Sequence, residues 1–140
     1  MSYQSSYSLT LERKIGEVFE HLEVDAKKAL RVIQKEIDTR GKKIMASELM
    51  QLRIVRGLVL EMTGKLDEAR AEVLGVLKEV KETALADHYV LDTFLKTTQR
   101  MTAREEYMAE YLKVIEILHA KHPKDKELVF TLFNGALSNN

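Results

Sequence analysis

Helix-breaking residues are scarce in this chain, which has one proline, Pro123, and six glycines among its 140 residues. Glycine and proline most often end helices or form turns, so a chain with few of them favours long helices joined by short turns. The apolar residues agree, because from Met45 to Met62 they recur every three or four residues, the period of an amphipathic helix. No segment sustains the alternation of a strand. We therefore expect an all-α protein.

Capping and breaking residues predict where the helices begin and end. Asp25 is a good N-cap residue, Gly41 suits the left-handed turn after a helix, and Gly64 ends another helix. Thr102 with Glu105 resembles a capping box. We expect about seven helices, over residues 8–22, 25–40, 44–63, 66–82, 84–99, 102–121 and from 125 almost to the chain end, preceded by a flexible arm over residues 1–7.

Small residues recur at a nearly constant interval. Ala29, Ala69 and Ala109 are 40 residues apart, each in the second helix of an expected hairpin, and Gly16 and Gly57 are 41 apart in first helices. Short connections make neighbouring helices antiparallel, and small residues allow the two helices to pack closely. A 40-residue period of helix pairs is typical of an α-solenoid. A closed bundle in which the alanine spacing is coincidental is the alternative.

Residues 45–81 resemble a tetratricopeptide repeat. Gly57 stands 12 residues before Ala69, as the small pair does in that family, and the turn from Gly64 to Ala69 resembles its Gly-x-x-x-Glu-Ala turn. Arg53 and Lys81 depart from the family's apolar opener and its proline. The resemblance implies one helical-repeat domain over residues 8–140, a right-handed superhelix of antiparallel hairpins. Its expected packing and turn residues are Gly16, Ala29, Gly57, Gly64, Ala69 and Ala109.

Most of the chain is also similar in pattern to the N-terminal repeats of the auxiliary subunit of N-terminal acetyltransferase B. The most specific part runs from Arg56 to Leu58 and from Thr63 to Ala69. The resemblance implies a non-catalytic cytoplasmic scaffold whose partner is a catalytic acetyltransferase subunit and which contacts the ribosome. A stand-alone tetratricopeptide-like adaptor that binds peptides or chaperone tails is the alternative.

The composition argues against several other functions. Twenty-two basic and 22 acidic residues give a formal net charge of zero, which does not favour nucleic-acid binding driven by overall charge. The chain has no cysteine for a disulfide, a zinc-thiolate site or a nucleophile, and its glycines never form a phosphate-binding loop. No apolar run approaches the roughly 18 residues of a membrane span. We expect no enzymatic activity, no cofactor and no membrane insertion.

Three potential metal ligands, His119, His122 and Asp125, lie near the end of the predicted helix over residues 102–121. Pro123 interrupts the helix between them, so they do not share one helix face. We expect no metal, and we expect the histidines to interact with free carbonyl groups at the helix end.

Basic residues crowd one segment, where only Glu36 and Asp38 oppose them. A shared surface would suit RNA phosphates, for example on a ribosome. The alternative is an ordinary solvated helix face with a basic last turn. The residues of this basic segment are Lys27, Lys28, Arg31, Lys35, Arg40, Lys42 and Lys43.

The last predicted helix carries apolar side chains in several directions around its axis, among them Leu128, Phe130 and Phe133. One neighbouring helix covers only part of that circumference. We expect the remainder to meet the next helix of a longer solenoid, a partner, or a second copy, so that the chain self-associates. Packing within a compact bundle is the alternative.

Overall fold

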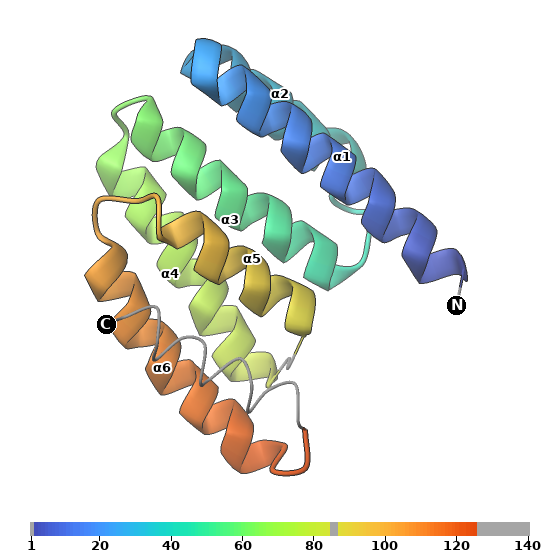
Figure 1. The fold of residues 1–140 in the computed structure, drawn as a ribbon, viewed down its shortest axis with the longest axis vertical. Helices are drawn as coiled ribbons and strands as arrows, with labels where there is room; N and C mark the ends of the chain where they lie inside the picture. Colours follow the sequence, from blue (N-terminus) through green and yellow to red (C-terminus); the bar gives the residue numbers. More distant parts are fainter. Residues whose placement is uncertain (1, 85–86, 126–140) are drawn as a thin grey trace.

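The computed structural model describes residues 2–84 and 87–125, and within these ranges the chain forms helices and no strand. The prediction of an all-α protein is confirmed. Figure 1 shows the six described helices. They are α1 (Ser2–Val24), α2 (Ala26–Arg40), α3 (Ala46–Met62), α4 (Leu66–Thr83), α5 (His88–Thr98) and α6 (Arg104–Lys121). The seventh predicted helix lies outside the described residues apart from Asp125.

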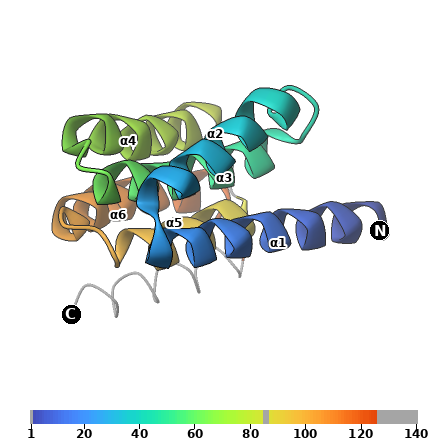
Figure 2. The same cartoon turned by 90° about the horizontal axis from the view of Figure 1, so that it is seen from above.

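Consecutive helices form three antiparallel hairpins, α1/α2, α3/α4 and α5/α6 (Figure 1). Helix α3 is central, because it contacts α1, α2, α4 and α5, while α6 packs mainly against α4. Figure 2 shows α1 and α5 on one side of the molecule and α2 and α4 on the other, with α3 between them. No helix in the described part of the chain is long and apolar enough to cross a membrane.

Two helices begin at places that differ from the prediction. Helix α1 begins at Ser2, so the residues expected to form an arm, from 2 to 7, belong to the helix. Helix α5 begins at His88, four residues later than expected. The reason is local: Ala84 adopts a left-handed backbone with φ of 52° that ends α4, and the Asp87 carboxylate caps α5 by accepting from the backbone N–H groups of Tyr89 and Val90.

Two of the three predicted single-residue signals are confirmed. The Asp25 side chain accepts a hydrogen bond from Lys28 N at 3.2 Å and caps α2. Gly64, with φ of 86°, ends α3 in a left-handed turn in which Lys65 N donates to Leu60 O. The prediction for Gly41 is wrong, because its backbone is right-handed. A glycine is needed at position 41 because there is no space for a side chain: a Cβ there would lie 2.4 Å from the carbonyl oxygen of Ile37.

The start of α6 depends on a distant residue. The predicted capping box of Thr102 and Glu105 is wrong: α6 begins at Arg104 after Ala103, without a side-chain cap. The backbone N–H of Thr102 instead donates to both carboxylate oxygens of Glu61, at 3.1 and 3.0 Å. Since Glu61 belongs to α3, a negative charge from the central helix is placed at the start of α6, where a helix macrodipole favours it.

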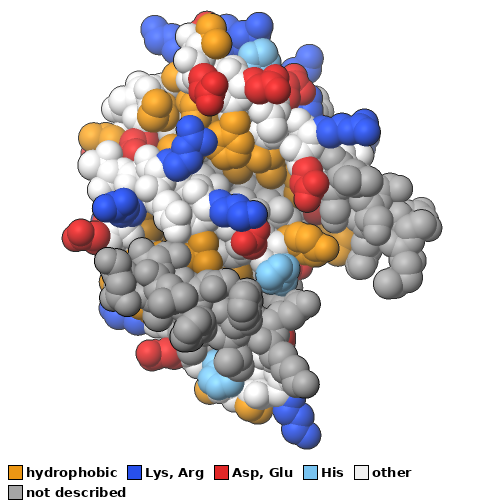
Figure 3. Space-filling view, viewed as in Figure 1, with side chains coloured by type: hydrophobic (Ala, Val, Ile, Leu, Met, Phe, Trp, Pro, Cys, Tyr) orange, Lys and Arg blue, Asp and Glu red, His pale blue; other side chains and the backbone are white. Residues whose placement is uncertain are grey.

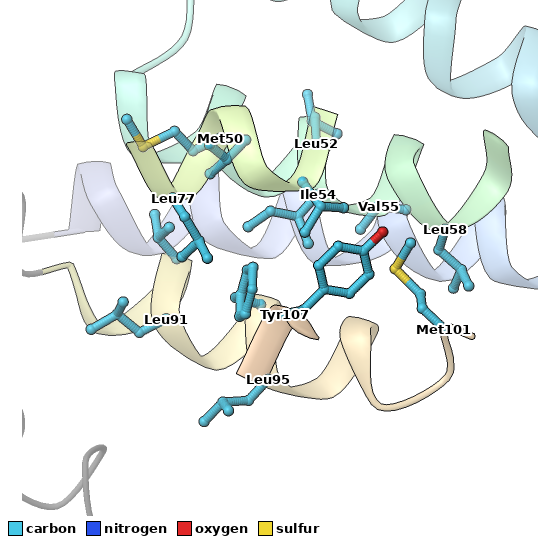
Figure 4. Packing of buried hydrophobic residues seen from close by; sticks show 14 of the residues in the cluster. Met50, Leu52, Ile54, Val55, Leu58, Leu77, Leu91, Leu95, Met101 and Tyr107 are labelled. Carbon is cyan, nitrogen blue, oxygen red and sulfur yellow. The ribbon is translucent and has the colours of Figure 1, made fainter. Parts of the chain in front are cut away.

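Buried apolar side chains from every described helix form one core. Figure 4 shows the part of it where α3 side chains meet those of α4, α5 and α6. Tyr111 of α6 is fully buried and stacks on Phe94 of α5, with the ring centroids 5.2 Å apart. Its hydroxyl has no hydrogen-bond partner among the described residues, and burial raises the pKa of Tyr111.

Helices α3 and α4 approach each other most closely at Gly57. A Cβ at this position would lie 2.6 Å from Cγ2 of Val73 and 3.6 Å from the carbonyl oxygen of Ala69. Both Gly57 and Ala69 are buried. Gly16 does not have the expected packing role, because it is exposed and a Cβ there would meet nothing within 4 Å.

The burial pattern repeats, but not with a constant period. Ala29 and Ile33 of α2 are buried, and Ala69 and Val73 of α4 are buried 40 residues later. Tyr107 and Tyr111 of α6 follow these two α4 positions after 38 residues. Ala109, predicted to be the third small packing residue, is therefore exposed. A difference of two residues rotates a position by about 200° around a helix, which takes Ala109 to the opposite face.

Arg53, which departs from the tetratricopeptide pattern, belongs to a network of ion pairs between α3 and α4. Its guanidinium donates to Glu72 at 2.9 Å and to Glu79. Arg56, one turn later, also donates to Glu72, and its Nε donates to Gln34 of α2 at 2.6 Å. Three consecutive helices are thus joined by polar contacts at the edge of the core.

The contact at Gly57 predicts opposite effects of one substitution at two sites. Alanine has a helix propensity about 1 kcal/mol better than glycine. For Gly57→Ala, we expect overpacking against Val73 to cost about 1–3 kcal/mol and to outweigh that gain, lowering the free energy of unfolding. The matched control Gly16→Ala should raise it by about 0.5–1 kcal/mol. Chemical denaturation measures both, and a Gly57→Ala variant as stable as Gly16→Ala would contradict the contact.

The unpaired hydroxyl of Tyr111 predicts a stabilising deletion. A buried hydroxyl without a partner costs about 1–3 kcal/mol, and phenylalanine keeps the ring that stacks on Phe94. We expect Tyr111→Phe to raise the free energy of unfolding by about 1 kcal/mol, whereas the control Tyr111→Leu, which removes the ring, should lower it. A less stable phenylalanine variant in chemical denaturation would mean that the hydroxyl has a partner.

Candidate functional site

A groove of about 300 Å³ runs along the outer surface between α4 and α6. Its floor is apolar: Leu77 and Val114 are buried, and Leu74 and Ile117 are half-buried. Charged side chains line its sides. They are Arg70, Lys78 and Lys81 from α4, and Glu106, Glu110 and Lys113 from α6. An apolar floor between charged sides is suited to an amphipathic polypeptide segment.

The spacing of the lining residues explains why they face one another. Arg70, Leu74, Leu77 and Lys81 follow at intervals of four, three and four residues, and so lie along one side of α4. Glu106, Glu110, Lys113 and Ile117 have the same intervals along α6. We did not predict this groove from the sequence, although the sequence contains its two stripes of apolar and charged residues with equal spacing.

One end of the groove is closed by an ion pair between the two helices. Arg70 donates to Glu106 through Nε at 2.9 Å and through Nη2 at 2.6 Å, the two-pronged geometry that guanidinium and carboxylate groups favour. The hydrogen bond from Arg70 lowers the pKa of Glu106, and the same bond raises the pKa of Arg70. Both side chains are largely exposed, so water screens their attraction.

The remaining charges leave basic groups available. Lys113 is paired with Glu110 at 3.2 Å, so the acidic groups lining the groove already have basic partners. Lys78 is 3.9 Å from Glu82, at the limit of an ion pair, and it is 73% exposed. Lys81 has no ion-pair partner within the described ranges of the chain and is exposed. The lining carries four basic and two acidic side chains, and its unpaired charge is positive.

The predicted basic segment is only partly brought together. Lys27, Lys28, Arg31 and Lys35 are exposed and fall within about 100° around α2. Arg40 lies on a different side of α2, is half-buried, and pairs with Glu36 at 2.9 Å. Lys42 and Lys43 are exposed in the turn after α2. Four of the seven residues therefore form a basic stripe. The last of them, Lys35, also lines a small groove between α1 and α2.

The described side chains on the face that carries α1 and α5 are of mixed charge. Figure 3 shows acidic and basic side chains interspersed there, with hydrophobic side chains between them. This mixture is ordinary for a protein surface.

The two histidines near the end of α6 lie apart from any metal-binding cluster. His122 Nε2 lies 3.2 Å from the carbonyl oxygen of Ala84, the left-handed residue that ends α4. The sequence predicted a carbonyl group at the end of the histidine's own helix, whereas the observed carbonyl group belongs to the end of α4. His119 Nδ1 is buried and has no partner among residues 2–84 and 87–125. The part of the chain that is described contains no group of three side chains suited to hold a metal ion.

The predicted interface residues Leu128, Phe130 and Phe133 lie outside the described residues, so that prediction stays untested. Comparison with protein-family models, with curated proteins and with solved structures gives no match. The groove between α4 and α6 is the candidate site on the geometry of the chain's own residues.

The Arg70–Glu106 pair predicts a pH-dependent effect on stability. Because folding lowers the pKa of Glu106 from its usual 4.5, the unfolded chain binds this proton more readily, and the pair stabilises the protein above that pH. We expect Glu106→Gln to lower the thermal midpoint at pH 7 and the difference from the parent to vanish as pH falls below the folded pKa. Glu116→Gln, an exposed control on the same helix, should show no such trend. A difference for Glu106→Gln that is equal at all pH values would contradict the pairing.

Proposed function

We propose that this chain is a non-catalytic scaffold that holds a partner protein, in the manner of the auxiliary subunit of an N-terminal acetyltransferase complex. The observation that supports the proposal is the groove between α4 and α6, which has an apolar floor and charged sides. Grooves of this kind bind a helix by its apolar face. Its lining spans residues 70–81 of α4 and 106–117 of α6, about 18 Å on each helix, which accommodates about three turns of a partner helix.

The resemblance of the chain to helical-repeat scaffolds supports the same proposal and suggests the partner, a small catalytic acetyltransferase in the cytoplasm. In this function the present chain positions the partner and performs no chemistry itself. A stand-alone adaptor for peptides or chaperone tails would use the same groove and is the second candidate.

A ribosome contact is a further part of the proposal. It is supported by the exposed basic stripe of Lys27, Lys28, Arg31 and Lys35, whose charges would meet RNA phosphates. This stripe lies on α2, whereas the groove is formed by α4 and α6, so a partner in the groove and an RNA on the stripe would not compete for the same residues.

Site-specific crosslinking in the cell tests the scaffold function. A photoreactive amino acid replaces Lys78, which lines the groove, and in a matched variant it replaces Ala71, which is exposed on α4 but does not line the groove. We expect the Lys78 position to crosslink one protein that the Ala71 position does not, and mass spectrometry then identifies it.

A small acetyltransferase among the crosslinked and co-purified proteins supports the auxiliary-subunit function, and a chaperone by itself supports the adaptor. The absence of any protein that co-purifies with the chain and depends on the groove position would contradict both.

A further inference from the structure

We infer that the groove between α4 and α6 selects an amphipathic helix with one acidic flank on a partner protein. This inference rests on the proposed function and specifies the chemistry of the partner segment. Three features of the groove support it. They are the charge that remains unpaired, the shape of the apolar floor, and the direction in which the two helices run.

The unpaired charge of the groove is positive. Both lining carboxylates, Glu106 and Glu110, already have a basic partner at 3.2 Å or less. Lys81 has no ion-pair partner in the described part of the chain, and Lys78 has only the distant Glu82 at 3.9 Å. A partner that brings carboxylates to these lysines forms new ion pairs and competes only with the distant Lys78–Glu82 contact. A partner that brings lysine or arginine there meets uncompensated positive charge.

The floor requires an apolar ridge on the partner. Leu74 and Ile117 are half-buried, whereas Leu77 and Val114 are buried, so Leu74 and Ile117 retain apolar surface that a partner side chain can cover. Helices α4 and α6 run in the same direction (Figure 1), and a third helix can place its ridge of side chains between them. Apolar residues at intervals of three and four on the partner match this arrangement.

The groove is asymmetric along its length. Arg70 and Glu106 pair near the N-terminal ends of α4 and α6, whereas Lys78 and Lys81 lie in the last two turns of α4. The acidic flank of the partner therefore belongs near the C-terminal end of α4, and its apolar ridge belongs over Leu74 and Ile117. The chain's own residues 126–140 suit the site less well, because Glu127, their one acidic side chain, is offset by Lys126.

Fluorescence anisotropy on the full chain tests the inference with two synthetic helical peptides. Both have about 18 residues and carry leucines at intervals of three and four, and one has glutamate where the other has lysine. We expect the glutamate peptide to bind at least about tenfold more tightly at low salt, and this preference to shrink at high salt as the charges are screened. Equal binding of the two peptides, or tighter binding of the lysine peptide, would overturn the inference.

Charge-reversal variants assign the preference to the groove. Lys78→Glu with Lys81→Glu should abolish or reverse the preference for the glutamate peptide, whereas the same charge change at Lys27 and Lys28 of α2 should leave it nearly unchanged. Circular dichroism of each variant checks that the helices are retained. Leu74→Ala should weaken the binding of both peptides, because it removes floor area that they share. An equal loss from both pairs of charge reversals would show non-specific attraction and overturn the inference.

Two further outcomes separate this inference from the proposed function. If a partner crosslinks at Lys78 in the cell but its binding is unaffected by Lys78→Glu with Lys81→Glu, the scaffold function stands and the acidic-helix inference fails. If an RNA oligonucleotide displaces the glutamate peptide and itself depends on Lys78 and Lys81, the groove is a phosphate site and the inference also fails.

Discussion

The missing side chain of Gly57 allows α3 and α4 to pack at a distance that no other residue would permit. A Cβ at this position would lie 2.6 Å from Val73, a β-branched side chain that cannot swing away easily. Because α3 contacts four of the five other described helices, its position relative to α4 affects the whole arrangement. The ion pairs of Arg53 and Arg56 with Glu72 span the same interface and depend on the same close approach.

Because α6 packs mainly against α4, the position of α4 against α3 also affects the position of α6. Arg70 and Glu106 join the two helices on the outside, and the α6 residues Tyr107, Tyr111 and Val114 fill the inside. Both ends of α6 are also held by polar contacts to other elements. Glu61 of α3 accepts from Thr102 before the first turn, and His122 after the last turn meets the Ala84 carbonyl. The groove between α4 and α6 is therefore formed by two helices whose relative position is fixed at several points.

The α5/α6 hairpin buries larger side chains than the α3/α4 hairpin, whereas hairpins of a regular repeat would bury similar ones. In α6, Tyr107 and Tyr111 stand where α4 has Ala69 and Val73, so large rings replace small side chains at the buried positions. One of these rings, Tyr111, stacks on Phe94 of α5. The space between α5 and α6 is thus filled by aromatic rings, whereas the space between α3 and α4 is closed by small residues.

The sequence by itself determined the helical content, the cap of α2 at Asp25 and the end of α3 at Gly64. These features depend on residues within about one helical turn of each other, and a sequence shows them directly. The tertiary structure alone decided that Gly16 and Ala109 are exposed, that Glu61 meets the start of α6, and that the basic segment is split at Arg40. It also brought together the two stripes that form the groove. The physical reason is the helical rotation. Successive side chains are about 100° apart around a helix, so a two-residue change in repeat length moves a side chain from the core to the opposite face.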